Sequence, residues 1–114
     1  MIDYSKQLVA ALNTILPTHY ELFLTSKTET PCISYQERNN AVDRNGDTLG
    51  YSKVSYTVKV WGNDIAAVNK YAIDIDNLLR PMGWKRTAIG ELKDINSTMI
   101  QKIMTFEALA VESF

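Results

Sequence analysis

A nucleophile and a general base are the first reactive pair that the sequence offers. The chain has one cysteine, Cys32, and one histidine, His19. A thiolate beside an imidazole can carry out covalent catalysis, provided that the fold brings the two side chains together. His19 has no second histidine or cysteine near it, so the several ligands that a metal centre needs are missing. The pattern favours Cys32 as a small strand residue in a half-buried layer and His19 as a structural or exposed side chain.

Acidic residues gather in two places without forming a typical site. Residues 43–47, DRNGD, resemble the start of an EF-hand loop, but Thr48 stands where glycine is required and Val54 replaces the bidentate acid. Asp74 and Asp76 are two positions apart on an expected helix, so their carboxylates point in different directions. Phosphate-loop and nucleophile-elbow motifs are also missing from the sequence. We therefore expect no catalytic residue, no metal ion and no cofactor.

The first half of the chain predicts one helix and two strands. Residues 3–16 carry apolar side chains at helical spacing, and Pro17 ends that helix because proline lacks an amide hydrogen. Residues 20–25 and Cys32 to Arg38 then read as strands.

A long loop is predicted to follow these strands. Residues 39–50 are rich in Asn, Asp and Gly, and Asn45-Gly46 is a strong turn signal because both residues tolerate positive φ. The sequence therefore predicts an antiparallel hairpin whose long, exposed tip is mobile until something holds it.

The second half begins with the clearest pattern in the chain. Residues 51–61 alternate between apolar and polar side chains, which indicates a half-buried strand. Asp64 is placed to cap a helix that ends near Arg80-Pro81, and Gly83 permits the chain to reverse into a short strand over residues 84–87. Residues 88–97 are predicted to form a loop, and a last strand is expected over residues 98–111.

The predicted second helix has one apolar residue in an unexpected position. Ile73 falls well away from the apolar stripe, which consists of Ile65, Val68, Ala72, Ile75 and Leu79. A single exposed isoleucine is ordinary, but the last strand is also apolar on both faces, and together they favour a partner surface. Trp61 and Trp84, at the two ends of this helix, are expected to pack around it rather than to stack on a base or sugar.

The expected order of elements is α-β-β-β-α-β-β, which predicts the α+β class. Two helices would pack on one face of a mainly antiparallel sheet. The 114 residues are the length of a single domain, residues 1–114, and 46% of them are apolar. With 12 basic and 13 acidic residues the net charge is −1, which disfavours specific nucleic-acid binding. The lone cysteine, the lack of a signal-peptide pattern and the lack of an apolar run of ~20 residues predict a cytosolic protein that is not bound to a membrane.

Three segments together carry a family resemblance. They are Pro31 to Gln36 (PCISYQ), the aromatic-ended strand Val58 to Trp61 (VKVW), and the WGND turn with its helix and Gly-Trp return, residues 61–84. In this order, after an amphipathic first helix, they resemble the tail completion, or tail terminator, proteins of long-tailed phages and prophages. The resemblance covers residues 5 to 111. It concerns a pattern of elements, and related head–tail joining proteins share that pattern.

The resemblance implies a structural role. Such proteins form a ring, commonly a hexamer, that caps the finished tail tube, ends tail growth and presents a surface to the head. Implied partners are other copies of the chain, the tail tube protein and a head–tail connector protein, in a virion assembled in the bacterial cytoplasm. Ile73 and the turn residues Asn45, Gly46 and Asp47 are the predicted partner contacts. The alternatives are a head–tail connector or neck protein and, from a different class, a small ligand-binding or enzymatic α+β domain.

Overall fold

The computed structural model describes residues 5–25, 28–44, 49–93 and 99–113. In these ranges the chain forms two α-helices, two short 3₁₀ helices and five strands. In order they are α1 (Ser5–Leu12), β1 (Thr18–Tyr20), η1 (Glu21–Phe23), β2 (Cys32–Arg44), β3 (Leu49–Gly62), α2 (Ile65–Leu79), η2 (Arg80–Met82), β4 (Lys85–Lys93) and β5 (Ile100–Ser113).

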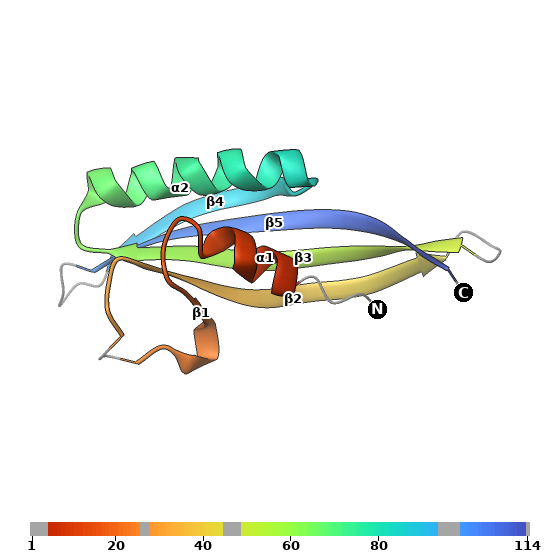
Figure 1. The fold of residues 1–114 in the computed structure, drawn as a ribbon, viewed down its shortest axis with the longest axis horizontal. Helices are drawn as coiled ribbons and strands as arrows, with labels where there is room; N and C mark the ends of the chain where they lie inside the picture. The colour runs from red at the N-terminus through yellow and green to blue at the C-terminus, as the bar shows by residue number, and fades with distance from the viewer. Residues whose placement is uncertain (1–4, 26–27, 45–48, 94–98, 114) are drawn as a thin grey trace.

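The described strands form one sheet in the order β1-β2-β3-β5-β4 (Figure 1). Only β1 runs parallel to its neighbour, and all other pairs are antiparallel. The predicted α+β class with a mainly antiparallel sheet is therefore confirmed. β3 and β5 lie at the centre and pair from Leu49↔Ser113 to Gly62↔Ile100.

Both helices cover the same face of the sheet, as predicted. The alternation read from residues 51–61 places Val54, Tyr56, Val58 and Val60 of β3 on this face, where they are fully buried. β5 adds Met104 and Phe106, which pair with Val58 and Tyr56. The helices contribute Leu8 and Leu12 from α1, and Val68, Ala72, Ile75 and Leu79 from α2. Full burial of one such side chain contributes roughly 1.5–3 kcal/mol, so this one-sided core is the main source of stability.

Both ends of α2 follow from local sequence. The Asp64 carboxylate accepts a hydrogen bond from the Ala66 amide at 3.1 Å, which confirms the predicted cap. Gly83 has φ of +94°, a left-handed conformation that glycine adopts at low cost and that turns the chain back after η2. Trp84 then inserts into the core, and its ring lies edge-on to Tyr56 with 5.7 Å between the centroids.

Three predicted boundaries are wrong. Two ranges expected in a mobile loop, residues 39–44 and 49–50, instead continue β2 and β3. The ladder extends this far because β3 also pairs with β5 on its other side. Residues 88–93, also expected in a loop, belong to β4, since pairing with β5 overrides their mixed composition. Residues 20–25 contain only the end of β1 and then η1.

The extended ladder makes the protein long. Its principal extents are 53 × 25 × 23 Å. Residues 39–44 of β2, 49–53 of β3 and 109–113 of β5 pair as a three-stranded arm that projects beyond α1 and α2 (Figure 1). The predicted contact residues Asn45, Gly46 and Asp47 at the turn lie outside the described residues.

We expect Gly62→Ala to destabilise the protein by about 1–3 kcal/mol, the usual cost of overpacking. A Cβ at Gly62 would lie 2.9 Å from Val68 Cγ2, so α2 would have to move away from β3. Gly90→Ala is the matched control, because a Cβ there meets no atom within 4 Å. Urea unfolding measures both variants, and equal midpoints would contradict the close packing of β3 against α2.

Candidate functional site

Cys32 and His19 belong to neighbouring strands but show no catalytic pairing. In the sheet register His19 lies opposite Ser34, and Cys32 lies opposite Trp61. Cys32 is buried, and desolvation raises the pKa of its thiol above the ordinary value. A raised pKa keeps the thiol protonated near neutral pH, which is the reverse of what an activated nucleophile requires. The arrangement fits the predicted structural reading of Cys32.

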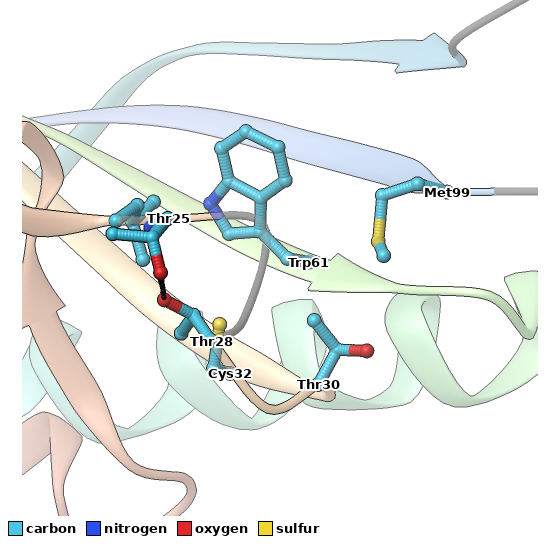
Figure 2. Close-up of a pocket in the computed structure, with 7 residues that line it drawn as sticks. Thr25, Thr28, Thr30, Cys32, Trp61 and Met99 are labelled. Carbon is cyan, nitrogen blue, oxygen red and sulfur yellow. Dashed lines mark hydrogen bonds between the residues drawn. The ribbon is translucent and has the colours of Figure 1, made fainter. Parts of the chain in front are cut away.

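Trp61 forms the wall of a cavity on the sheet face opposite the helices. The cavity has a volume of about 340 Å³ and is lined by Leu24, Thr25, Thr28, Thr30, Cys32, Trp61 and Met99. Figure 2 shows the indole between Met99 on one side and Thr25, Thr28 and Cys32 on the other, with Thr30 below. The Trp61 Nε1–H donates a hydrogen bond to Ser34 Oγ at 2.9 Å. The expectation that Trp61 packs around α2 is therefore wrong, whereas that for Trp84 is confirmed.

Charged and hydroxyl side chains dominate the rest of this second face. Lys59 Nζ lies 2.6 Å from Glu21 Oε1 and 5.9 Å from the Trp61 ring centroid, so it ties η1 to the sheet beside the cavity. Further along, Lys53 Nζ lies 3.7 Å from Glu107 Oε1. Residues 21–25 and 28–30 thus lie at the end of the face near Trp61, and the described remainder of the face is mainly polar.

Several acidic residues in the described ranges serve as ion-pair partners. Asp76 Oδ2 lies 2.5 Å from Arg80 Nη2 and 3.9 Å from Arg86 Nη1, so this carboxylate joins α2 to the start of β4. Asp74 and Asp76 lie on different sides of the helix, as predicted from their spacing. Among the described residues, no group of three or more His, Cys, Asp or Glu side chains is placed to hold a metal ion.

Three isoleucines form an exposed apolar surface on α2 and β4. Ile73 is 60% exposed, which confirms that it lies outside the core. Ile65 is 45% exposed, so its predicted place in the buried stripe is wrong, because it is the first residue of α2 and lies outside the core. Ile89 of β4 is 49% exposed, and we call the three residues the α2–β4 patch.

Spacing along the two elements gives the level of Ile89 relative to α2. The Asp76–Arg86 ion pair fixes the alignment of α2 with β4, which run in opposite directions after Gly83. From that contact, Asn69 on α2 and Ile89 on β4 each lie about 10 Å away, at about 1.5 Å per helical residue and about 3.3 Å per strand residue. Along the axis of α2, Ile89 is therefore at about the level of Asn69, between the levels of Ile65 and Ile73.

A β-bulge turns Ile89 towards the helices. The register of β4 shifts between Arg86 and Ala88, so Thr87 is the extra residue and both Arg86 and Ile89 face the helix side. Asn69 of α2 has a buried Oδ1 without a hydrogen-bond donor among the described residues. Sequence reasoning found Ile73 by its place on the helical wheel but missed Ile89, because the bulge has no clear sequence signal.

No protein-family model and no curated protein matches the sequence. Within the described residues, neither helix has the length and apolar character needed to cross a membrane.

We expect the Cys32 thiol to react slowly with disulfide reagents in the folded protein at pH 7–8. Because the folded thiol has a raised pKa, the unfolded thiol ionises first as the pH rises. The contribution of the buried Cys32 thiol to stability is therefore fully present at pH values below the pKa of the unfolded thiol. It is lost as the pH rises through the pKa of the folded thiol. Labelling rates in buffer and in urea, with the pH dependence of unfolding compared between wild type and Cys32→Ala, measure both effects. Fast labelling of the native protein at pH 7 would contradict the buried thiol and favour an enzyme.

Proposed function

We propose that this protein is a tail terminator of a long-tailed phage or prophage, a structural subunit that assembles into a ring on the tail tube. The observation that carries the proposal is the α2–β4 patch, where three isoleucines are between 45% and 60% exposed on one side of an elongated domain. Contiguous apolar side chains on a folded surface mark sites of protein association. The order of elements that underlies the family resemblance also agrees with the fold.

The three-stranded arm supports the same role. It extends the sheet beyond the helices and gives the subunit a rigid projection, which suits contact with a tube or with a neighbouring subunit (Figure 1). Backbone pairing on both sides of β3 along the arm makes it stiffer than the loop predicted from sequence. Docking by the arm therefore loses little conformational entropy.

In this proposal the ring is a hexamer of identical chains. It binds the last ring of tail tube protein on one side and a head–tail connector protein on the other, and it stops further tube growth by occupying the tube end. It acts without catalysis, cofactor or metal, and it assembles in the host cytoplasm before it becomes part of the virion.

The cavity at Trp61 favours a second candidate, a small-molecule binding domain. Its volume of about 340 Å³ is near the lower end of the range for ligand sites, and its lining combines one indole with threonine hydroxyls. None of the described lining residues is acidic, so the cavity favours binding of a small, mostly apolar ligand over acid–base chemistry. Quenching of Trp61 fluorescence by a panel of such compounds, compared with Trp61→Phe, tests this candidate.

We expect the purified protein to form a ring and to bind the ends of purified tail tubes. Analytical ultracentrifugation and native mass spectrometry measure the ring, and electron microscopy of labelled protein mixed with tubes measures the capping. Tubes polymerising in the presence of the protein should be shorter than tubes polymerising alone. If the protein stays monomeric and leaves tube length unchanged, the proposed function is wrong.

We expect Ile73→Asp to weaken self-association by about tenfold or more while leaving the thermal midpoint nearly unchanged, because Ile73 contributes little to the core. Met82→Asp is the matched control, since Met82 is 45% exposed and lies in η2, outside the patch. Sedimentation and thermal unfolding measure the two effects. Loss of the folded monomer in Ile73→Asp would show instead that Ile73 supports the core.

A further inference from the structure

The three-stranded arm has two outer edges with no strand beside them among the described residues. β1 pairs with β2 only from Ile33 to Tyr35, so none of the described strands lies outside β2 over residues 36–44. On the other side β4 pairs with β5 only as far as Glu107, which leaves residues 108–113 of β5 without a described outer strand. We call residues 39–44 the β2 edge and residues 108–113 the β5 edge.

The direction of the backbone groups along each edge follows from the ladder. The Ile33 amide donates a hydrogen bond to the Pro17 carbonyl oxygen at 2.9 Å, so the N–H and C=O of Ile33 face β1. Backbone groups alternate in direction along a strand, the register of β3 with β5 is uninterrupted, and that of β2 with β3 shifts once, between Glu37 and Asn39. Through this register, the backbone groups of every second edge residue point outward, away from β3. These residues are Asn40, Val42 and Arg44 on the β2 edge, and Leu109, Val111 and Ser113 on the β5 edge.

The other two edges of the sheet have features that disfavour addition of a strand. β4 has a bulge after Arg86 and a lysine at each end. β1 is three residues long, and the next element, η1, leaves the sheet with Leu22 70% and Phe23 78% exposed. The arm differs, because residues 39–44 (NNAVDR) and 108–113 (ALAVES) contain neither lysine nor proline. The arm edges are therefore the better places for another strand to pair.

The β2 edge and the β5 edge are complementary to each other. Both strands run antiparallel to β3, so they run in the same direction, and Val42 and Ala110 lie at one level on the two sides of Ser52. When the β5 edge of one copy lies beside the β2 edge of another at this level, Val42 is opposite Ala110. The outward N–H of Val42 then meets the C=O of Leu109, and its C=O meets the N–H of Val111. This is the bonding pattern of a parallel pair, and it needs no slip along the strands.

We propose that the β2 edge of one copy pairs in parallel with the β5 edge of the next copy, so that the arms form one continuous sheet around a ring. This inference rests on the proposed function and identifies the strands that would join neighbouring subunits. A contact between two unlike edges is heterologous, and it generates a ring when the rotation between copies closes. Closure gives every arm edge a partner, and main-chain hydrogen bonds supply the affinity.

The shape of the subunit favours joining at the arm. The sheet is five strands wide where β1 and β4 pair with it and three strands wide in the arm, which projects beyond both helices (Figure 1). Copies standing side by side along their whole length would collide at the wide ends. Copies that meet at the narrow arms, with the wide ends splayed outward, avoid this collision. Pairing of two β2 edges around a two-fold axis would instead leave both β5 edges open.

Proline at outward-facing positions tests the proposal. Proline removes an N–H and is tolerated on an edge strand where that N–H faces solvent, so Val42→Pro and Val111→Pro each block one edge and keep the ladder inside the arm. Each variant alone should show a dissociation constant for self-association raised by about tenfold or more. An equimolar mixture should form a one-to-one heterodimer through the edge that each variant retains. Sedimentation measures association, and near-UV circular dichroism verifies folding.

Matched controls and the possible results separate this inference from the proposed function. Val42→Thr and Val111→Thr keep the amide and should assemble like wild type. If the two proline variants also assemble like wild type, or are monomeric and folded but give no heterodimer on mixing, the inference is overturned while a wild-type ring remains. A heterodimer from the mixture, with no binding to tail tubes by wild type, would support the inference and overturn the tail role.

Cysteine cross-linking measures the register without proline. Within one chain β3 separates Val42 from Ala110 by about 10 Å, at about 4.8 Å per strand, which is too far for a disulfide. In a Cys32→Ala background, Val42→Cys and Ala110→Cys chains mixed under mild oxidation should therefore form a linked dimer, and neither chain should do so alone. Cross-linking of Val42→Cys with itself would overturn the parallel arrangement.

Discussion

The apolar face shared by β3 and β5 determines where every other element lies. Tyr56 pairs with Phe106 and Val58 with Met104, and this central surface has to be covered on one side. α2 covers it because the chain reverses at Gly62 and again at Gly83, and α1 completes the cover through Leu8 and Leu12. Because one helix layer is sufficient, the second sheet face is left to short segments and polar side chains. The sheet is therefore asymmetric. One of its faces is buried under the helices, and the other is mainly polar.

The surfaces available for association follow from this asymmetry. α2 packs on β3 and β5, and Ile65 and Ile73 lie outside this contact and stay exposed. At the other edge, β1 is only three residues long, and η1 turns out of the sheet directly after it. Two apolar patches at opposite edges are thus a consequence of covering a wide sheet with two short helices. Because the two helices are short, neither of them covers the three-stranded arm.

Sequence reasoning was reliable where a pattern is local. Alternation in β3, the Asp64 cap, the end of α2 near Arg80 and the left-handed Gly83 all depend on residues close in sequence, and the structure has each of them. It was unreliable where pairing between distant segments decides the outcome. Residues 39–44 and 88–93 have loop-like compositions, yet they are strands because β3 and β5 offer them partners. Trp61 was misplaced for a related reason, since a strand residue one position from Gly62 faces the opposite side of the sheet from the helices.

The sequence by itself determined the α+β class, the order of the main elements, the residues of the central apolar strand and the exposure of Ile73, because periodicity and capping act over a few neighbouring residues. Only the tertiary structure decided the strand order β1-β2-β3-β5-β4, the length of the arm, the cavity at Trp61 and the position of Ile89 on the helix side of the sheet. These features depend on register and on a bulge, which arise from contacts between residues far apart in the chain. The sequence therefore indicated only the unexplained isoleucine of α2 as a part of the candidate interface. The structure added the exposed isoleucine of β4.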